Sequence, residues 1–149
     1  MQWLHAGQGA MLSRRVLSGA LVPTASRVAI VDDDASMRRA TRNLLQAAGF
    51  RVTTFSSAEA FLGAKRRHGI SCLVADMRMT GMSGLQLHEA LAAAGDGVVT
   101  ILITAYDDEA LRLRARAAGI HCCLGKPFPP EALCECVRTA LASQAIPRS

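Results

Sequence analysis

Short apolar runs alternate with amphipathic segments along most of the chain, beginning near residue 27. The runs are five or six residues long and consist mainly of β-branched and other apolar side chains. Such runs are typical of strands that are buried on both faces, because neither face then needs a polar side chain. We therefore predict five strands, at residues 27–31, 51–55, 71–75, 98–103 and 120–124.

The segments between these runs have helical periodicity. In the first segment, Met37, Leu44 and Leu45 fall on one face, whereas Arg38 and Arg42 fall on the opposite face. Helices are predicted at residues 35–48, 57–67, 83–94, 107–118 and 129–143. Strict alternation of strands and helices predicts an α/β protein, with a doubly wound parallel sheet that helices cover on both faces.

The ends of several predicted helices carry local signals. Ser56 with Glu59, and Ser83 with Gln86, have the spacing of a capping box at two helix starts. Gly49 stands where the first helix should stop, and glycine is favoured immediately after a helix. These signals support the predicted helix boundaries.

Residues 1–26 differ from the rest of the chain, since they mix Gly, Ser and Ala with scattered apolar residues. The pair Arg14 and Arg15 precedes a short apolar run and faintly resembles a signal peptide, but Ser and Gly interrupt that run. We expect a disordered or weakly ordered extension, at most weakly helical, which a misassigned start codon would also produce. A single domain over residues 27–146 is expected to follow.

The net charge of +5 does not indicate a nucleic-acid partner. Three arginines and no acidic residue lie within residues 1–27, and the rest of the chain has 14 basic and 12 acidic side chains. Direct DNA binding requires a concentrated basic stripe, which this distribution lacks. The sequence also has no run of about 20 apolar residues that could span a membrane.

The five cysteines indicate reduced thiols and a cytoplasmic location, because an odd number is unusual in a disulfide-bonded domain. Zinc binding is one possible role for four of them, Cys122, Cys123, Cys134 and Cys136. Adjacent cysteines on a strand point to opposite faces, which disfavours one shared four-ligand site. We therefore interpret the cysteines, including Cys72, as residues of the core.

Polar residues follow four of the predicted strands. They are Asp32, Asp33 and Asp34 after the first strand, Asp76 after the third, Thr104 and Ala105 after the fourth, and Lys126 after the fifth. Ligands of doubly wound folds bind beyond the carboxyl ends of the strands, so we expect these residues to converge. One aspartate could be a helix cap, and this is our interpretation of Asp34.

Such a group of residues suits phosphoryl chemistry. Carboxylates held close together repel one another, and a divalent cation relieves that repulsion. Oxygen ligands of this kind favour Mg²⁺. A carboxylate can also attack phosphorus as a nucleophile, and a lysine can neutralise the charge on the phosphoryl oxygens.

The segments VAIVDDDASMRRATRNLLQAAGF, LVADMRMTGMSGLQL, ILITAYDD and GKPF are spaced as in one known family. Residues 27–143 resemble the receiver domains of bacterial response regulators, and most of all the receivers of nitrogen-fixation regulators. Each motif alone is weak, but the four together in this order are specific. The resemblance implies a flavodoxin-like fold with five helices and five strands in the order 2-1-3-4-5.

The resemblance also implies roles for individual residues. Asp76 corresponds to the phosphoacceptor. Asp32, Asp33, Asp76 and the backbone carbonyl of Arg78 correspond to the Mg²⁺ site, with Asp32 acting largely through water. Thr104 resembles the switch hydroxyl, and Ala105 and Lys126 would help to stabilise the phosphoryl group. The bond from Lys126 to the next residue, Pro127, is often cis in this family.

Two positions depart from the family pattern. Cys123 replaces an aromatic residue that in many receivers moves inward with the switch threonine, so this switch position is doubtful. Thr80 replaces a proline that is common in the loop after the phosphoacceptor. These differences affect the coupling to an output more than the phosphorylation chemistry.

The function implied by the resemblance is phosphorelay signalling by a phosphoacceptor that assists its own phosphorylation and dephosphorylation and is not a classical enzyme. The partners would be a sensor histidine kinase or a histidine phosphotransfer protein, and an unidentified downstream protein. Only six residues follow position 143, so we expect a stand-alone receiver, either a monomer or a phosphorylation-dependent dimer.

The alternatives are a pseudo-receiver that binds its partner regardless of phosphorylation, and the receiver fragment of a DNA-binding response regulator. A small phosphatase or nucleotide-binding enzyme is disfavoured, because no glycine-rich loop follows the first strand.

Overall fold

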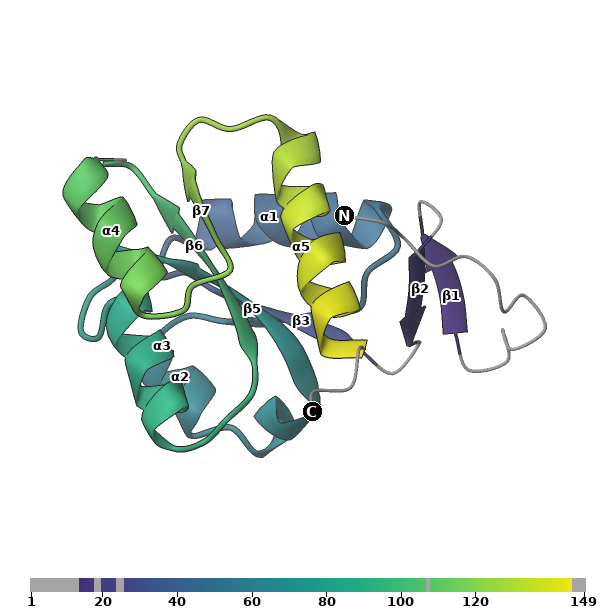
Figure 1. The fold of residues 1–149 in the computed structure, drawn as a ribbon, viewed down its shortest axis with the longest axis horizontal. Coiled ribbons are helices and arrows are strands. Elements are labelled where there is room, and N and C mark those ends of the chain that lie inside the picture. The colour runs from purple at the N-terminus through teal and green to yellow at the C-terminus, as the bar shows by residue number, and fades with distance from the viewer. Residues whose placement is uncertain (1–13, 18–19, 24–25, 107, 146–149) are drawn as a thin grey trace.

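The computed structural model describes residues 14–17, 20–23, 26–106 and 108–145 (Figure 1). Its strands are β1 (Arg14–Leu17), β2 (Ala20–Pro23), β3 (Arg27–Val31), β4 (Val52–Phe55), β5 (Ile70–Asp76), β6 (Val99–Thr104) and β7 (Cys122–Gly125). Its helices are α1 (Ala35–Ala47), α2 (Ala58–Leu62), α3 (Gly84–Ala93), α4 (Glu109–Ala117) and α5 (Pro130–Ala145), with a 3₁₀ helix at Lys65–Gly69. In the described part of the chain, no helix is both long and apolar enough to cross a membrane.

The main sheet has five strands in the order β4-β3-β5-β6-β7, and every neighbouring pair is parallel. Numbered along the chain from β3, this is the predicted order 2-1-3-4-5. Each of these strands begins and ends within two residues of its predicted bounds. Because all five strands run in one direction, their carboxyl ends meet at one end of the sheet.

Helices cover both faces of the main sheet (Figure 1). Leu45 of α1 and Leu133 of α5 are buried in the core on one face. Phe61 of α2, Leu87 of α3 and Ala115 of α4 are buried in the core on the other face. Burial on both faces explains why the strands are continuous apolar runs and do not alternate with polar residues.

Three helix-end predictions are confirmed. The Asp34 side chain caps α1 by accepting a hydrogen bond from the amide of Met37 at 3.1 Å. Ser83 and Gln86 form the predicted capping box at the start of α3. Gly49 has a φ of 99°, a left-handed conformation that glycine adopts without the steric cost of a Cβ.

The predicted cap of the second helix is wrong by one residue. Ser57, and not Ser56, is the N-cap of α2, and its Oγ accepts the amide of Ala60 at 2.9 Å. The Glu59 carboxylate does not complete a capping box, because it accepts a hydrogen bond from a distant loop, as described below. Two adjacent serines made the sequence signal ambiguous.

The prediction of one continuous helix over residues 57–67 is also wrong. The α-helix ends at Leu62, and a separate 3₁₀ helix begins at Lys65. Gly63, which follows Leu62, is a poor helix former. The Arg67 side chain donates a hydrogen bond at 3.1 Å to the carbonyl of Leu62, and so satisfies a carbonyl that the ending helix leaves without an intrahelical partner.

Strands β1 and β2 form a two-stranded antiparallel sheet that is separate from the main sheet. These residues are extended and are not the weak helix that was one expectation for this segment. The other residues up to position 25 lie outside the described part of the chain. The division into an extension over residues 1–26 and a domain over residues 27–146 stays a prediction.

Candidate acidic site at the carboxyl end of the sheet

The fold brings the predicted site residues to one end of the sheet. Asp32 and Asp33 follow β3 directly, Asp76 is the last residue of β5, and Thr104 is the last residue of β6. Lys126 follows β7. These strands lie side by side in the order β3-β5-β6-β7, so their ends are neighbours.

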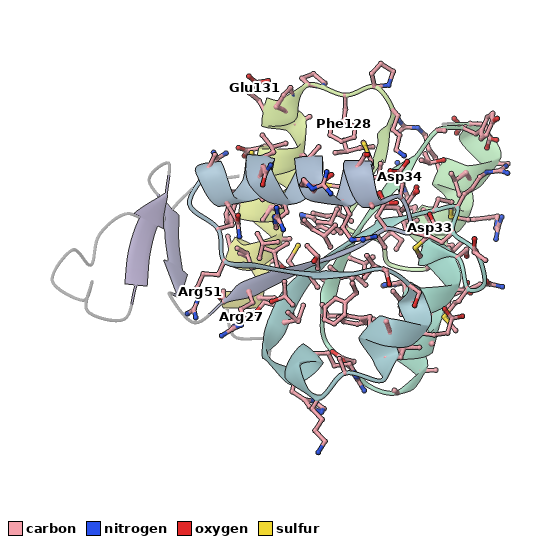
Figure 2. The ribbon with its side chains drawn as sticks, turned by 180° about the vertical axis from the view of Figure 1, so that it is seen from behind. Arg27, Asp33, Asp34, Arg51, Phe128 and Glu131 are labelled. Atoms are coloured by element: carbon pink, nitrogen blue, oxygen red, sulfur yellow. The ribbon has the colours of Figure 1, made fainter. Side chains whose placement is uncertain are left out.

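Three carboxylates form the centre of this region. Asp32, Asp33 and Asp76 each offer one oxygen, and these oxygens all lie within 4.8 Å of one another. We call these three residues the acidic site. Figure 2 labels Asp33 at the end of α1 where Asp34 caps the helix. Three oxygen ligands at this spacing can hold a divalent cation.

The acidic site is partly shielded from solvent. Asp32 is buried, with 6% of its surface exposed, whereas Asp33 is exposed. Burial raises the pKa of both Asp32 and Asp76 above the ordinary range, and for Asp76 the neighbouring Asp32 carboxylate adds to this effect. The site therefore binds protons more readily than isolated aspartates do. A bound cation would offset the repulsion between the carboxylates.

One ammonium group faces the acidic site. The Nζ atom of Lys126 lies 3.8 Å from Oδ1 of Asp76. The amide of Lys126 donates a hydrogen bond at 2.8 Å to the carbonyl of Thr104, which fixes the start of the loop after β7. The bond between Lys126 and Pro127 is cis, as the family resemblance implied. This arrangement places a positive charge next to Asp76, where an added anionic group would also contact it.

The loop after β5 is held by carboxylates from two other elements. Asp33 Oδ2 accepts the amide of Thr80 at 2.8 Å, and Glu59 Oε2 accepts the amide of Met82 at 3.1 Å. Glu59 belongs to α2, and its spacing from Ser56 predicted only a helix cap. No local pattern could reveal its role, because the two bonded residues are 23 positions apart.

Gly84 is required for the close approach of α3 to Asp76. A Cβ at this position would lie 2.6 Å from the carbonyl oxygen of Asp76, which is closer than nonbonded atoms can approach. The amide of Gly84 also donates to the carbonyl of Met77 at 3.1 Å. The first residue of α3 therefore packs directly against the end of β5.

The Thr104 hydroxyl is buried and engaged in local hydrogen bonds. It accepts the amide of Tyr106 at 3.0 Å and donates to the carbonyl of Tyr106 at 3.2 Å. Ala105, between them, is exposed. The guanidinium of Arg78 lies over the Tyr106 ring, 4.6 Å from its centroid, and the amide of Arg78 donates to the Asp76 carboxylate. The Arg78–Tyr106 contact was not predicted from the sequence.

The five cysteines pack in the core, as predicted, and none is in a disulfide. Cys122 packs against the core on the α1 and α5 face, whereas Cys123 packs against the core on the opposite face. Adjacent residues of β7 therefore point to opposite sides of the sheet. Among the described residues, the acidic site is the one group whose ligand atoms gather closely enough for a metal ion.

Comparisons with known proteins agree with this fold. Residues 28–138 match the sequence profile of the response regulator receiver domain. The chain is 39% identical over 116 residues to the response regulator protein TmoT of Ectopseudomonas mendocina, covering 78% of this chain and 53% of TmoT. It is 36% identical over 124 residues to the transcriptional regulatory protein FixJ of Azorhizobium caulinodans, covering 83% of this chain and 59% of FixJ. The chain thus spans between half and three fifths of the length of these relatives.

Solved structures give the same result. The response regulator StyR is 45% identical and superposes with a TM-score of 0.74, covering 80% of this chain and 61% of that one. The structure titled FixJ-N is 30% identical and has a TM-score of 0.73, covering 83% of this chain and 98% of that one. The structural similarity therefore extends over about four fifths of the chain.

Proposed function

The chain belongs to the response regulator receiver domain family, and from this membership we propose that Asp76 accepts a phosphoryl group beside a bound Mg²⁺ ion. Receiver domains interact with sensor histidine kinases or histidine phosphotransfer proteins, and such a protein would be the donor. One observation carries the proposal: the three carboxylates of the acidic site lie within 4.8 Å of one another, and the Lys126 ammonium lies 3.8 Å from Asp76.

The residues present suit Mg²⁺ binding. Asp32, Asp33 and Asp76 offer oxygen ligands only, which this hard cation prefers. Burial and the neighbouring carboxylates raise the pKa of Asp32 and Asp76, and a nearby positive charge would stabilise their ionised forms. In the proposed site the backbone carbonyl of Arg78 is a further ligand, and Asp32 acts through water. A bound ion would supply the positive charge that offsets both the carboxylates and the incoming phosphoryl oxygens.

Asp76 is the best placed nucleophile of the three. Its Oδ1 lies 3.8 Å from Nζ of Lys126, so a phosphoryl group carried by Asp76 would contact that ammonium. A carboxylate oxygen of Asp76 would attack the phosphorus of a phosphohistidine, forming a P–O bond while the P–N bond breaks. The bonding electrons return to the imidazole nitrogen of the donor, which leaves as neutral histidine after taking up a proton.

Lys126, Thr104 and Ala105 would stabilise the transferred group. The Lys126 ammonium is a compact charge that would contact a phosphoryl oxygen. The Thr104 hydroxyl would have to exchange its bonds to Tyr106 for a bond to the phosphoryl group. That exchange would move Ala105 and Tyr106, which follow Thr104 in the chain. The movement would carry the signal from the acidic site toward α4.

Phosphorylation would change the contacts that α4, β7 and α5 make with a downstream protein. The proposed location of the protein is the cytoplasm. Relatives named as transcriptional regulators favour a second candidate, in which this receiver controls transcription through a DNA-binding region or partner. Cys123 favours a third candidate, a pseudo-receiver whose partner contacts ignore phosphorylation, since a thiol cannot replace the movement of an aromatic ring. Partner binding by the Asp76→Ala variant separates this candidate, which predicts unchanged affinity, from the other two.

The proposal is tested by intact-mass analysis after incubation with acetyl phosphate and Mg²⁺. We expect one phosphoryl adduct on the wild type, no adduct on Asp76→Ala, and loss of the adduct when a chelator removes the metal. Asp96→Ala is the matched control, because it removes an aspartate from the opposite end of the sheet. A folded wild type that forms no adduct with Mg²⁺ present would contradict the proposal.

A further inference from the structure

Two cysteines meet at the seam between the last strand and the last helix. The side chains of Cys122 in β7 and Cys136 in α5 form a hydrogen bond with each other. Both are partly buried and pack against the same core, on the α1 and α5 face of the sheet. The two sulfur atoms are therefore direct neighbours and not isolated core thiols. We call Cys122 and Cys136 the cysteine pair.

A second contact fixes the alignment of these two elements. Nε2 of His121, the residue before Cys122, lies 2.7 Å from Oγ1 of Thr139, which is one helical turn beyond Cys136. The Thr139 hydroxyl in turn donates to the carbonyl of Cys136 at 3.0 Å. Because the hydroxyl donates to that carbonyl, it accepts the N–H of the imidazole. These two contacts hold β7 and α5 in the alignment in which Cys122 faces Cys136.

The two thiols differ in reactivity. The hydrogen bond from the Cys136 thiol lowers the pKa of Cys122, because it stabilises the Cys122 thiolate. The same hydrogen bond, with burial, raises the pKa of Cys136. The thiolate is the reactive form of cysteine, so we assign Cys122 as the nucleophile and Cys136 as the thiol that reacts afterwards. By contrast, complete burial raises the pKa of Cys72, which makes it inert.

We propose that the cysteine pair is a reversible oxidation site that a peroxide converts into a disulfide. The Cys122 thiolate attacks one peroxide oxygen, the O–O bond breaks, and the leaving hydroxide takes up one proton to become water. Cys136 then attacks the resulting sulfenic acid, forming the S–S bond and releasing a second water. The two thiols together lose two electrons and two protons, and one hydrogen peroxide is reduced to two waters. A dithiol reductant reverses the reaction by exchange.

The disulfide would close a loop that contains Lys126. The segment between the two cysteines carries this residue and its cis bond to Pro127. A covalent link from β7 to α5 restrains both ends of that segment, so oxidation would change how freely the Lys126 ammonium approaches Asp76. This consequence rests on the proposed function, whereas formation of the disulfide does not.

The position of the disulfide can be read from a double digest. The reduced full chain is treated with hydrogen peroxide, its remaining thiols are alkylated, and it is cut with trypsin and with a glutamate-specific protease. Cuts after Arg116, Glu131, Glu135 and Arg138 yield peptides 117–131, 132–135 and 136–138. Cys136 is alone in the last peptide, and Cys134 is alone in the middle one.

We expect peptide 117–131 to be joined to peptide 136–138 in the wild type and in the control variant Cys123→Ser. The link should be lost in Cys122→Ser and in Cys136→Ser, and dithiothreitol should remove it from the wild type. A link to peptide 132–135, a link that persists in Cys122→Ser, or full alkylation of Cys136 after oxidation would each overturn the proposal.

The functional consequence needs a separate measurement. We expect the rate of adduct formation from acetyl phosphate to differ between the oxidised and reduced wild type, and to be the same before and after peroxide treatment in Cys136→Ser. Equal rates in the oxidised and reduced wild type would overturn the link to Lys126. Absence of any adduct in either form would count against the proposed function, while the digest would still decide whether the cysteine pair forms a disulfide.

Discussion

At the amino end of the sheet, Arg67 of the 3₁₀ helix and Asp96, shortly before β6, form an ion pair at 2.9 Å. The other oxygen of Asp96 accepts the amide of Val98 at 3.1 Å. At the carboxyl end, the three carboxylates of the acidic site crowd within 4.8 Å, and the ammonium of Lys126 approaches Asp76 only to 3.8 Å. At the amino end two opposite charges pair closely, whereas at the carboxyl end three carboxylates of like charge gather.

Figure 2 shows where the two ends lie, with Arg27 and Arg51 at the amino end of β3 and β4, and Asp33 and Asp34 at the carboxyl end. Close pairing, as between Arg67 and Asp96, stabilises the folded chain and leaves no charge for a ligand. Crowded carboxylates reduce stability but provide a site for a cation and for an added phosphoryl group. This difference between the two ends supports our proposal that the carboxyl end carries the function.

The largest effect is expected from removing the Lys126 ammonium, the positive charge beside the acidic site. Lys126→Ala should slow adduct formation from acetyl phosphate by about two orders of magnitude, because the phosphoryl oxygens lose a charge that stabilises the transition state. Arg67→Ala removes a cation from the opposite end and should leave the rate unchanged. The measurement is the initial rate by intact mass. Equal slowing in both variants would show that the two ends do not differ in function.

Metal binding should be specific to the acidic site. Mg²⁺ should stabilise the wild type against heat, by about 2.7 kcal/mol at a concentration 100 times the dissociation constant. Asp33→Asn should weaken Mg²⁺ binding about tenfold or more, because it removes a charged ligand. Asp96→Asn should leave the affinity unchanged. Thermal unfolding at several Mg²⁺ concentrations measures both the stabilisation and the affinity for Mg²⁺. A similar loss of affinity in Asp33→Asn and Asp96→Asn would contradict the account.

The pH dependence of stability should also separate the two ends. The raised pKa of Asp76 means that its carboxyl stabilises the fold when protonated, and that this contribution is lost as the pH rises through the folded-state pKa. Without metal, Asp76→Asn should therefore become increasingly more stable than the wild type as the pH rises above about 4, the ordinary pKa of an aspartate. Chemical denaturation at each pH gives the difference in the free energy of unfolding between the variant and the wild type. A difference that does not change with pH would be evidence against crowding of charge around Asp76.

The smallest effect concerns the ion pair at the amino end. Arg67→Ala should lower the free energy of unfolding by about 1 kcal/mol, since the pair is only partly exposed. The pair of Arg138 and Glu135 on α5, also at 2.9 Å, is the control, because its carboxylate is exposed, and Arg138→Ala should cost about 0.3 kcal/mol. Denaturant titrations can resolve this difference. A larger cost for Arg138→Ala than for Arg67→Ala would show that the lower exposure of the Asp96 carboxylate does not strengthen its ion pair.

Much of the fold could be predicted because the strands are buried on both faces. Continuous apolar runs located all five strands of the main sheet to within two residues. The end of α2 could not be predicted in this way, because the periodicity of residues 57–67 continues past Gly63. The break depends on Gly63 and on the Arg67 side chain, which bonds to the carbonyl of Leu62. Such a side-chain contact leaves no periodic signal.

The site was predictable for a topological reason. In a parallel sheet the residues after each strand must converge, so Asp32, Asp76 and Lys126 could be grouped without coordinates. Glu59 could not be included, because its bond to the loop after β5 joins residues 23 positions apart. The contact between Cys122 and Cys136 was equally hidden, since it depends on how α5 lies against β7.

The central claim is that Asp76 itself carries the phosphoryl group, and locating the group tests this most directly. After reaction with acetyl phosphate and Mg²⁺, borohydride reduces an aspartyl phosphate to homoserine, and trypsin then releases peptide 68–78, in which Asp76 is the only acidic residue. We predict homoserine at position 76 in this peptide and an unchanged peptide 28–38, which contains Asp32 and Asp33. Homoserine in peptide 28–38, with peptide 68–78 unchanged, would contradict the account.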